Sequence, residues 1–151
     1  MELSLDYRRN GTGHKDIFLH FAGKTWIADS YYLGDDNGLP EDSAPAPHTQ
    51  NVLRGLLQQW AIPVDGLNPP GVAYLPYDFS DQYTAWLRCV RSEEEVAVCW
   101  GWAEVEAWSF SPSNPGDLMT GFKGFKAEGP EVHVPYDDLV EAVHAMLAAQ
   151  D

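Results

Sequence analysis

The chain has 151 residues, of which 44% are hydrophobic and 13% aromatic, and 23 acidic against 9 basic residues give it a formal net charge of −14. This length and apolar content predict a single folded domain spanning residues 1–151 and exclude a disordered chain. The charge repels phosphates and anionic lipids, so it excludes ordinary nucleic-acid and membrane-surface binding and favours a basic protein partner.

The N-terminal residues lack the basic segment and apolar core of a secretory signal, and no apolar run reaches the ~20 residues that span a bilayer. A cytoplasmic location is therefore expected. The two cysteines, Cys89 and Cys99, are too few for a disulfide framework. In a reducing compartment they are expected to be buried free thiols, although a bond between them is conceivable.

The first part of the chain predicts strands. Residues 3–7 alternate between apolar and polar side chains, and residues 17–21 follow a turn sequence at 10–13, so the two segments predict a hairpin. Residues 24–33 are predicted as a third strand, although their aromatic spacing also suits a short helix.

A helix is predicted to begin at Pro47, after the polar loop at 34–47, and to end at Pro63. Apolar residues recur along it at helical spacing. They are Val52, Leu53, Leu56, Leu57 and Trp60.

Three further strands are predicted at 72–77, 83–91 and 96–108, and Pro76 assigns the first of them to an edge or a bend. Matching side chains by size pairs Arg91 with Glu95 across a hairpin turn. The other opposite pairs in this register are Trp86 with Trp100, Thr84 with Trp102, Val90 with Val96, Ala85 with Gly101, and Cys89 with Ala97.

The strand at 96–108 has two unlike faces, because side chains alternate along a strand. The bulky face comprises Val96, Val98, Trp100 and Trp102, and the small-residue face comprises Ala97, Cys99, Gly101 and Ala103. The small-residue face is predicted to seat a helix. The predicted register makes Trp86, Trp100 and Trp102 core residues and places Cys89 and Cys99 diagonally on one face.

A last strand is predicted at 131–134, and Pro135 is predicted to open a C-terminal helix with Asp137 and Asp138 in its first turn. The apolar stripe of this helix is Tyr136, Leu139, Val140, Val143 and Leu147. The predicted fold class is α+β, an antiparallel sheet of five to seven strands with two main helices packed on it.

Catalytic and metal-binding signatures are missing from the sequence. None of the five histidines has His-x-x-x-His spacing, no Cys-x-x-Cys occurs, and residues 35–38 lack the alternation of a calcium loop. Cys99 and His133 could be imagined as a nucleophile and its base, but any chain with two cysteines and five histidines permits such a pair. We therefore expect no metal, no cofactor and no enzymatic activity.

Carboxylate chemistry is an alternative at the far end of the strand at 96–108. Glu104 and Glu106 share a face with Trp102 and Trp108. Two acids beside tryptophans are able to bind a sugar and hydrolyse it, so a small carbohydrate- or ligand-binding domain or enzyme is the second hypothesis. We favour the simpler interpretation that Glu104 and Glu106 lie at a solvated end of the strand.

Acidic clusters near aromatic residues favour a protein-binding surface, since acids steer association and aromatics anchor it. The candidate partner-binding residues are Asp35, Asp36, Glu41, Asp42, Glu93, Glu94, Glu95, Glu104, Glu106 and Trp108. Asp137 and Asp138 form a further acidic pair.

The segments at 99–106 and 134–139, in a small and strongly acidic α+β chain without catalytic motifs, resemble the bacterial immunity proteins of polymorphic toxin systems, of the contact-dependent inhibition or type VI secretion type. The resemblance is one of general character over the whole chain. It implies an inhibitor that covers the active site of a cognate toxin, often a basic nuclease. A monomer or weak dimer is expected.

Overall fold

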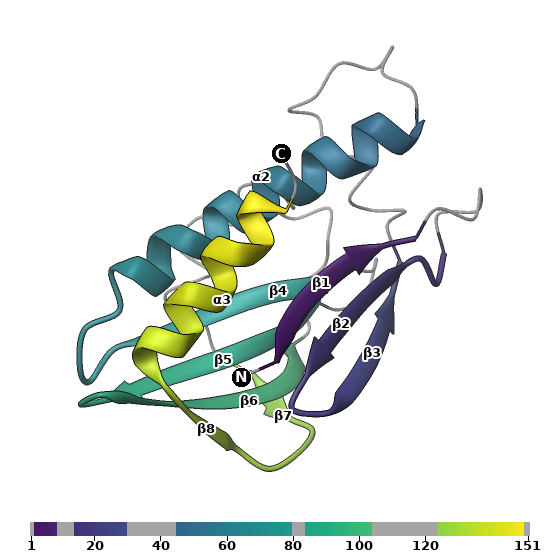
Figure 1. The fold of residues 1–151 in the computed structure, drawn as a ribbon. Coiled ribbons are helices and arrows are strands. Elements are labelled where there is room, and N and C mark those ends of the chain that lie inside the picture. The colour runs from purple at the N-terminus through teal and green to yellow at the C-terminus, as the bar shows by residue number, and fades with distance from the viewer. Residues whose placement is uncertain (1, 9–13, 30–44, 80–83, 104–123, 150–151) are drawn as a thin grey trace.

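The computed structural model of the protein contains two antiparallel sheets and two helices among the residues that it describes (Figure 1). The described residues are 2–8, 14–29, 45–79, 84–103 and 124–149. The predicted α+β class is confirmed, with the strands divided between a three-stranded and a five-stranded sheet.

The small sheet is built from the first three strands, β1 (Leu3–Tyr7), β2 (Ile17–Phe21) and β3 (Lys24–Ala28), in the order β1-β2-β3. The predicted hairpin is confirmed. The third segment is a strand rather than a helix as far as Ala28, and the predicted continuation through residues 30–33 lies outside the described residues.

The large sheet contains β4 (Val72–Phe79), β5 (Thr84–Ser92), β6 (Glu95–Ala103), β7 (Lys126–Ala127) and β8 (Val132–Pro135). The longest three strands form a meander, and both β7 and β8 pair with β6, at opposite ends of it. The part of the predicted strand that follows Ala103 lies outside the described residues.

Strand β4 is an edge strand, and its pairing with β5 shifts between Pro76 and Asp78. Both consequences predicted from Pro76, an edge position and an irregularity, are confirmed.

The register predicted for the β5–β6 hairpin is wrong by one residue. Glu95 pairs with Ser92 rather than with Arg91, so Trp86 lies opposite Gly101 and Trp100 opposite Leu87. Trp86 thus faces a residue without a side chain, and a Cβ on Gly101 would come within 2.6 Å of the Phe125 ring. The missing side chain of Gly101 makes room for Phe125 of another segment, which matching the two strands by size did not anticipate.

The one-residue shift also moves the cysteines apart. Cys89 lies opposite Val98 and Cys99 lies opposite Arg88, so the two thiols are on opposite faces of the sheet. Both cysteines are buried and free, which confirms the prediction of free thiols.

Helix α2 (Pro45–Asp65) begins before the predicted start at Pro47 and continues past Pro63. A proline near the end of a helix removes one backbone hydrogen bond but keeps a helical φ, so the last turn persists. Its inner stripe is fully buried, and the Trp60 indole N–H donates to the carbonyl oxygen of Pro76 in β4 at 2.9 Å. The buried stripe is Leu53, Leu56, Leu57, Trp60 and Val64.

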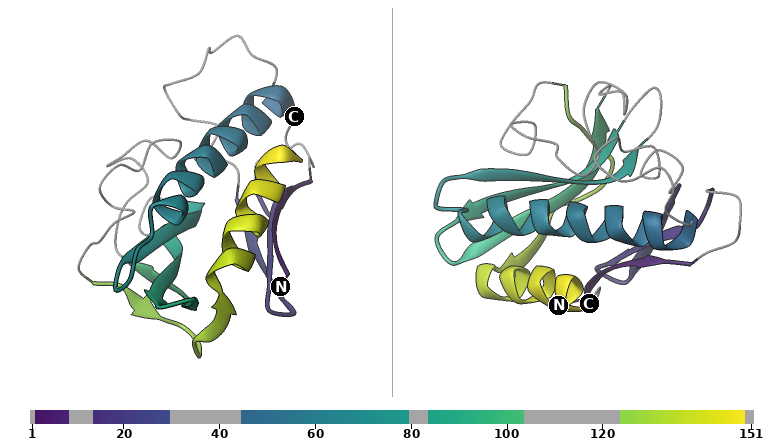
Figure 2. Two further views of the ribbon diagram at one scale, coloured as in Figure 1. Left: turned by 60° about the vertical axis from the view of Figure 1, so that its left-hand side comes forward. Right: turned by 90° about the horizontal axis from the view of Figure 1, so that it is seen from above.

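Helix α3 (Tyr136–Ala148) begins directly after Pro135, with Asp137 and Asp138 in its first turn, as predicted. It lies beside α2 and contacts β1, β6 and β8 (Figures 1 and 2). Leu139, Val143 and Met146 are its buried residues.

The helices cover the bulky face of β6, not the small-residue face that was predicted to seat one. Arg91 lies opposite Val96 on that bulky face, and its guanidinium sits 3.6 Å from the ring centroid of Tyr136 in α3. On the small-residue face, Gly101 is approached by Phe125 instead. The bulky side chains fill the core shared by the helices and both sheets, where Val96 and Val98 are fully buried.

Candidate partner-binding site

Exposed carboxylates gather where the β5–β6 turn, the start of α3 and the end of α2 meet. Glu94 and Glu95 have side chains that are 87% and 60% exposed, and Glu95 pairs with Pro135 directly before α3. The backbone N–H of Tyr136 donates to the carbonyl oxygen of Glu94 at 2.8 Å, which joins the turn to the helix. We call this the hairpin-end surface, formed by Asp65, Glu93, Glu94, Glu95 and Asp137.

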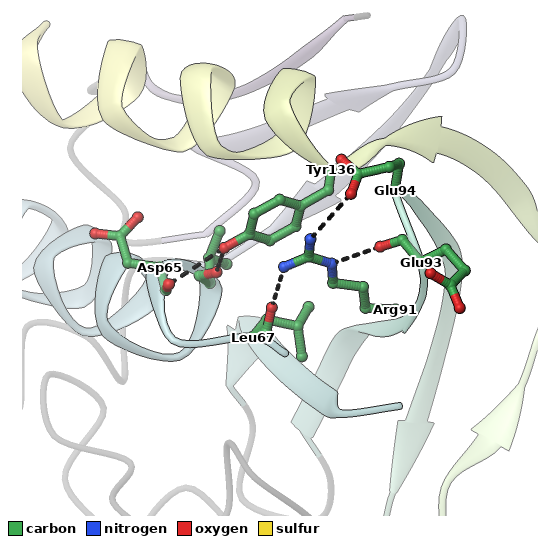
Figure 3. A network of polar contacts seen from close by, with 7 residues as sticks. Asp65, Leu67, Arg91, Glu93, Glu94 and Tyr136 are labelled. Atoms are coloured by element: carbon green, nitrogen blue, oxygen red, sulfur yellow. Dashed lines mark hydrogen bonds and ion pairs between the residues drawn. The ribbon is translucent and has the colours of Figure 1, made fainter. Parts of the chain in front are cut away.

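Arg91 holds the three elements of this surface together (Figure 3). Its guanidinium donates to the carbonyl oxygens of Leu67 at 2.6 Å and Glu93 at 2.8 Å, and it lies 4.0 Å from the Glu94 carboxylate. The Tyr136 hydroxyl donates to the carbonyl oxygen of Val64 at 2.7 Å at the end of α2. The acidic turn is therefore fixed to both helices.

Two histidines contact acids of the hairpin-end surface. His133 Nδ1 lies 2.5 Å from Glu95 Oε1, and His144 Nε2 lies 2.8 Å from Asp65 Oδ1. A histidine offsets a carboxylate fully only when it is protonated. The guanidinium of Arg91 is 13% exposed and directed inward, so the outward character of the surface is negative.

A second feature is an aromatic pocket of about 570 Å³ where β3 of the small sheet meets the large sheet. The pocket, which we call the tryptophan pocket, is lined by Trp26, Ile27, Tyr77, Asp78, Ala85, Trp100, Gly101, Trp102 and Glu128. Trp26 and Trp100 form one wall, with ring centroids 4.8 Å apart. Ile27 at its rim is 55% exposed, although it is a large apolar residue.

Asp78 gives the tryptophan pocket an unusual carboxyl group. Burial, together with the negative charge of Asp29, raises the pKa of Asp78 to about 6, although a hydrogen bond from the Asp29 backbone N–H partly opposes this rise. Burial also opposes ionisation of Asp29. Hydrogen bonds from the Lys15 backbone N–H at 2.8 Å and from His14 outweigh it, so the pKa of Asp29 is lowered. Asp29 is thus a fixed negative charge beside Asp78.

The tryptophan rings have cations and a carboxylate around them. Lys24 Nζ lies 4.7 Å from the Trp100 ring centroid, and Lys126 Nζ lies 4.6 Å from the Trp102 ring centroid. The indole N–H of Trp102 donates to Glu128 Oε1 at 2.5 Å, which fixes the orientation of this ring.

An acidic groove of about 450 Å³ lies between β1 and α3. Its acids are Asp6, Asp138 and Glu141, and its floor includes Leu3 and Met146. Asp138 of the predicted acidic pair lines this groove, whereas Asp137 belongs to the hairpin-end surface with Glu93.

The structure brings together only part of the predicted site. Glu93, Glu94 and Glu95 are exposed and adjacent, whereas the remaining candidates fall outside the described residues. Those remaining are Asp35, Asp36, Glu41, Asp42, Glu104, Glu106 and Trp108. Trp86 and Trp100 are core residues as predicted, while Trp102 is only partly buried and lines the tryptophan pocket.

The sequence reasoning missed the tryptophan pocket. Trp26, Asp78 and Glu128 lie in three separate segments, and no spacing pattern links them. The one signal was the acid that follows the irregularity in β4, because a bulge redirects the side chains next to it.

Neither metal-binding clusters nor membrane-spanning elements are found in the described part of the chain. No group of three or more histidine, cysteine, aspartate or glutamate side chains in these residues is arranged to hold a metal ion. Within the same residues, no helix has the combination of length and hydropathy required to cross a membrane.

The described residues form an α+β fold with two helices against a five-stranded sheet and a flanking three-stranded sheet. This fold is similar to that of a chain in the CdiA-CT/CdiI toxin and immunity complex from Enterobacter cloacae, with a TM-score of 0.56. The match covers 96% of this chain and 98% of the other chain, at 12% sequence identity. The resemblance inferred from the sequence is thereby confirmed at the level of the fold. No protein-family model and no curated protein matches the sequence.

Proposed function

We propose that this protein is an immunity-type inhibitor that binds a cognate toxin domain and neutralises it by covering its active site. The fold it shares with a chain of a toxin and immunity complex supports this proposal, because each chain of such a complex has a protein partner. The formal net charge of −14 favours the inhibitor of a basic toxin. The protein then acts by binding and not by catalysis.

The observation that carries the proposal is the hairpin-end surface. Its carboxylates are exposed, they are held on a rigid turn by Arg91, and two of them contact the exposed imidazoles of His133 and His144. A rigid negative surface attracts a positive one over distances near the Debye length, about 8–10 Å at physiological salt, and so speeds capture. A basic active site, such as that of a nuclease, is a partner of this character. We propose that the protein works as a monomer or weak dimer in the cytoplasm, without a cofactor.

The direct experiment is binding to the toxin-like protein encoded beside this chain's gene, by co-purification and calorimetry. We expect a complex of nanomolar affinity and loss of the toxin's activity. If the neighbouring protein neither binds nor loses activity, the proposal fails.

The role of the hairpin-end surface is tested by Glu93→Gln/Glu94→Gln. We expect association with the toxin to slow by about 3- to 10-fold at low salt, with less change in dissociation. The matched control is Glu2→Gln/Glu141→Gln, which removes two exposed acids elsewhere and is expected to change the rate by less than about 2-fold. Equal slowing in both variants indicates that net charge, and not this surface, steers the partner.

A small-ligand function is the second candidate, and the tryptophan pocket favours it. Tryptophan rings beside carboxylates suit the apolar face and the hydroxyl groups of a sugar. Trp102 lines this pocket, whereas Glu104, Glu106 and Trp108, which were part of the same hypothesis, fall outside the described residues. Titration with methyl glucoside, monitored by tryptophan fluorescence, tests it. A saturable change at millimolar concentration supports carbohydrate binding, and a flat titration dismisses this candidate for glucosides.

A further inference from the structure

The tryptophan pocket combines two kinds of wall. Rings of Trp26, Trp100 and Trp102 supply flat apolar surface, and the carboxyl groups of Asp78 and Glu128 supply negative charge. Among the described residues that line the pocket, none is basic. A side chain with an apolar stem and a cationic end matches both walls at once.

Among the described residues, no cation acts on the pKa of Asp78, and a fixed anion lies beside it. Burial disfavours its charged form and Asp29 repels it, while a hydrogen bond from the Asp29 backbone N–H lowers its pKa. A cation entering the pocket relieves both costs, because it supplies the missing opposite charge. The Asp29 carboxylate already has hydrogen bonds with Lys15 and His14. Its negative charge therefore adds to the negative potential at Asp78, while its own oxygens are engaged elsewhere.

The rings already accept cations in the unbound protein. Lys24 and Lys126 place ammonium groups within 5 Å of the Trp100 and Trp102 ring centroids, at 4.7 and 4.6 Å, yet neither lysine lines the pocket. The ring faces at this site are therefore accessible to positive charge and attract it. Exposed Ile27 adds apolar contact area at the rim, where a protein surface would meet the pocket.

We propose that the tryptophan pocket binds the side chain of an arginine presented by the protein partner. The guanidinium stacks on the indole rings and pairs with Asp78, while the methylene stem lies against Trp26 and Ile27. This inference rests on the proposed function and names the anchor of that interface. Arginine suits the pocket better than lysine because a planar guanidinium both stacks on a ring and donates to a carboxylate in two places.

The experiment uses N-acetyl-arginine amide as the probe and the indole N–H signals of the ¹⁵N-labelled protein as the readout. N-acetyl-citrulline amide, which has the same shape without the charge, is the matched ligand. We expect saturable shifts at Trp102 and Trp26 with the arginine probe, and at least about 5-fold weaker binding of citrulline. Equal binding of the two ligands, or no shift up to about 100 mM arginine probe, overturns the proposal.

The variant Asp78→Asn keeps the shape of the side chain and its hydrogen-bond acceptor but removes the charge. We expect it to weaken the arginine probe by about 5- to 10-fold, whereas Glu2→Gln, an exposed acid outside the pocket, leaves the affinity unchanged. Unchanged affinity in Asp78→Asn overturns the proposal. Methyl glucoside binding more tightly than the arginine probe overturns it in favour of a sugar site.

The unmodified protein supplies an independent measurement. Among the described residues, Asp29 acts directly on Asp78, Glu128 shares the pocket lining with it, and Lys24 and Lys126 lie over the Trp100 and Trp102 rings of that lining. Because the guanidinium stays charged, affinity for the arginine probe is expected to fall several-fold as the pH drops below about 6, where Asp78 becomes protonated. A flat profile between about pH 5 and pH 7.5 contradicts the inference.

Failure of this inference is distinguishable from failure of the proposed function. The arginine probe is tested without any toxin. If the pocket does not bind the probe but the protein still binds its toxin, only the proposed arginine anchor is refuted. A protein that binds no toxin, but whose pocket takes arginine, refutes the immunity role and leaves a cation-binding pocket.

Discussion

At the scale of single residues, Asp78 is the group whose chemistry departs furthest from that of a surface carboxylate. Its pKa is about 6 in the folded protein, against 3.8 for an ordinary aspartate. A carboxyl group with a raised folded pKa stabilises the fold fully below its unfolded pKa, and that stabilisation is lost as pH rises through the folded pKa. Ionised Asp78 therefore costs stability at neutral pH.

Asp78→Asn is expected to be more stable than the unmodified protein by about 1–3 kcal/mol at about pH 7.5. The difference is expected to shrink to less than about 0.5 kcal/mol at about pH 3.5, where Asp78 is protonated in the folded protein and mostly protonated in the unfolded chain. Urea unfolding at the two pH values measures it, with Glu2→Gln as the control for losing one acid. A variant that is less stable at neutral pH contradicts the electrostatic assignment of Asp78.

At the scale of secondary-structure elements, Arg91 joins the end of α2, the β5–β6 hairpin and the start of α3 (Figure 3). Arg91→Lys keeps the charge but cannot donate to both carbonyl oxygens and stack on Tyr136. We expect a loss of about 1–3 kcal/mol in the free energy of unfolding, measured with urea.

The matched control is Arg8→Lys. Arg8 also stacks on an aromatic ring, with its guanidinium carbon 4.5 Å from the Phe18 ring centroid, but it lies on the exposed face of the small sheet. Its replacement is expected to cost less than about 0.5 kcal/mol. Equal losses in the two variants contradict a special role for the hydrogen bonds of Arg91.

The β5–β6 hairpin shows how much of a secondary-structure element could be predicted from the sequence. Alternating side chains located both strands, but the register depends on the turn, which holds only Glu93 and Glu94. Glu93 has a φ of 58°, in the left-handed region that favours glycine, so its residue type gave no indication of so tight a turn. One residue of error then exchanged the neighbours of every side chain on β6.

The tryptophan pocket was harder to predict from the sequence than the register of the hairpin. Its walls come from β3, β4, β5, β6 and the residue that follows β7, and the contact between Trp26 and Trp100 depends on how the small sheet rests against the large one. Local patterns predict elements and their buried stripes, such as Leu53 to Trp60 in α2, but not the docking of two sheets. The acids of the hairpin end were predictable because consecutive Glu93, Glu94 and Glu95 are too polar to bury.

At the scale of the whole molecule, the formal net charge of −14 is a source of self-repulsion in the folded state. Exposed acids occupy the hairpin-end surface and the groove between β1 and α3, so the repulsion is spread over two sides of the protein. Screening by salt weakens it, since the Debye length falls below about 10 Å above 0.1 M salt.

We therefore expect the thermal midpoint to rise by about 2–5 °C between about 20 and 200 mM sodium chloride. Over the same range, the association rate with the proposed basic toxin is expected to fall, because salt screens the attraction between the two proteins as well as the repulsion within this one. Scanning calorimetry and stopped-flow mixing measure the two effects. A midpoint that is unchanged or lower at the higher salt concentration argues against net repulsion among the acids.

The contact between β1 and α3 has a consequence for how the protein is made. The first strand and the last helix of the described chain share one core, in which Leu5 and Val143 are both nearly inaccessible to solvent. On the ribosome, the small sheet must wait for almost the whole chain before its inner face is covered, and contacts this distant in sequence form slowly. Under the proposed immunity role, such a protein gives no protection while it is being translated, so a cell that relies on it needs a reserve of finished molecules before the toxin arrives.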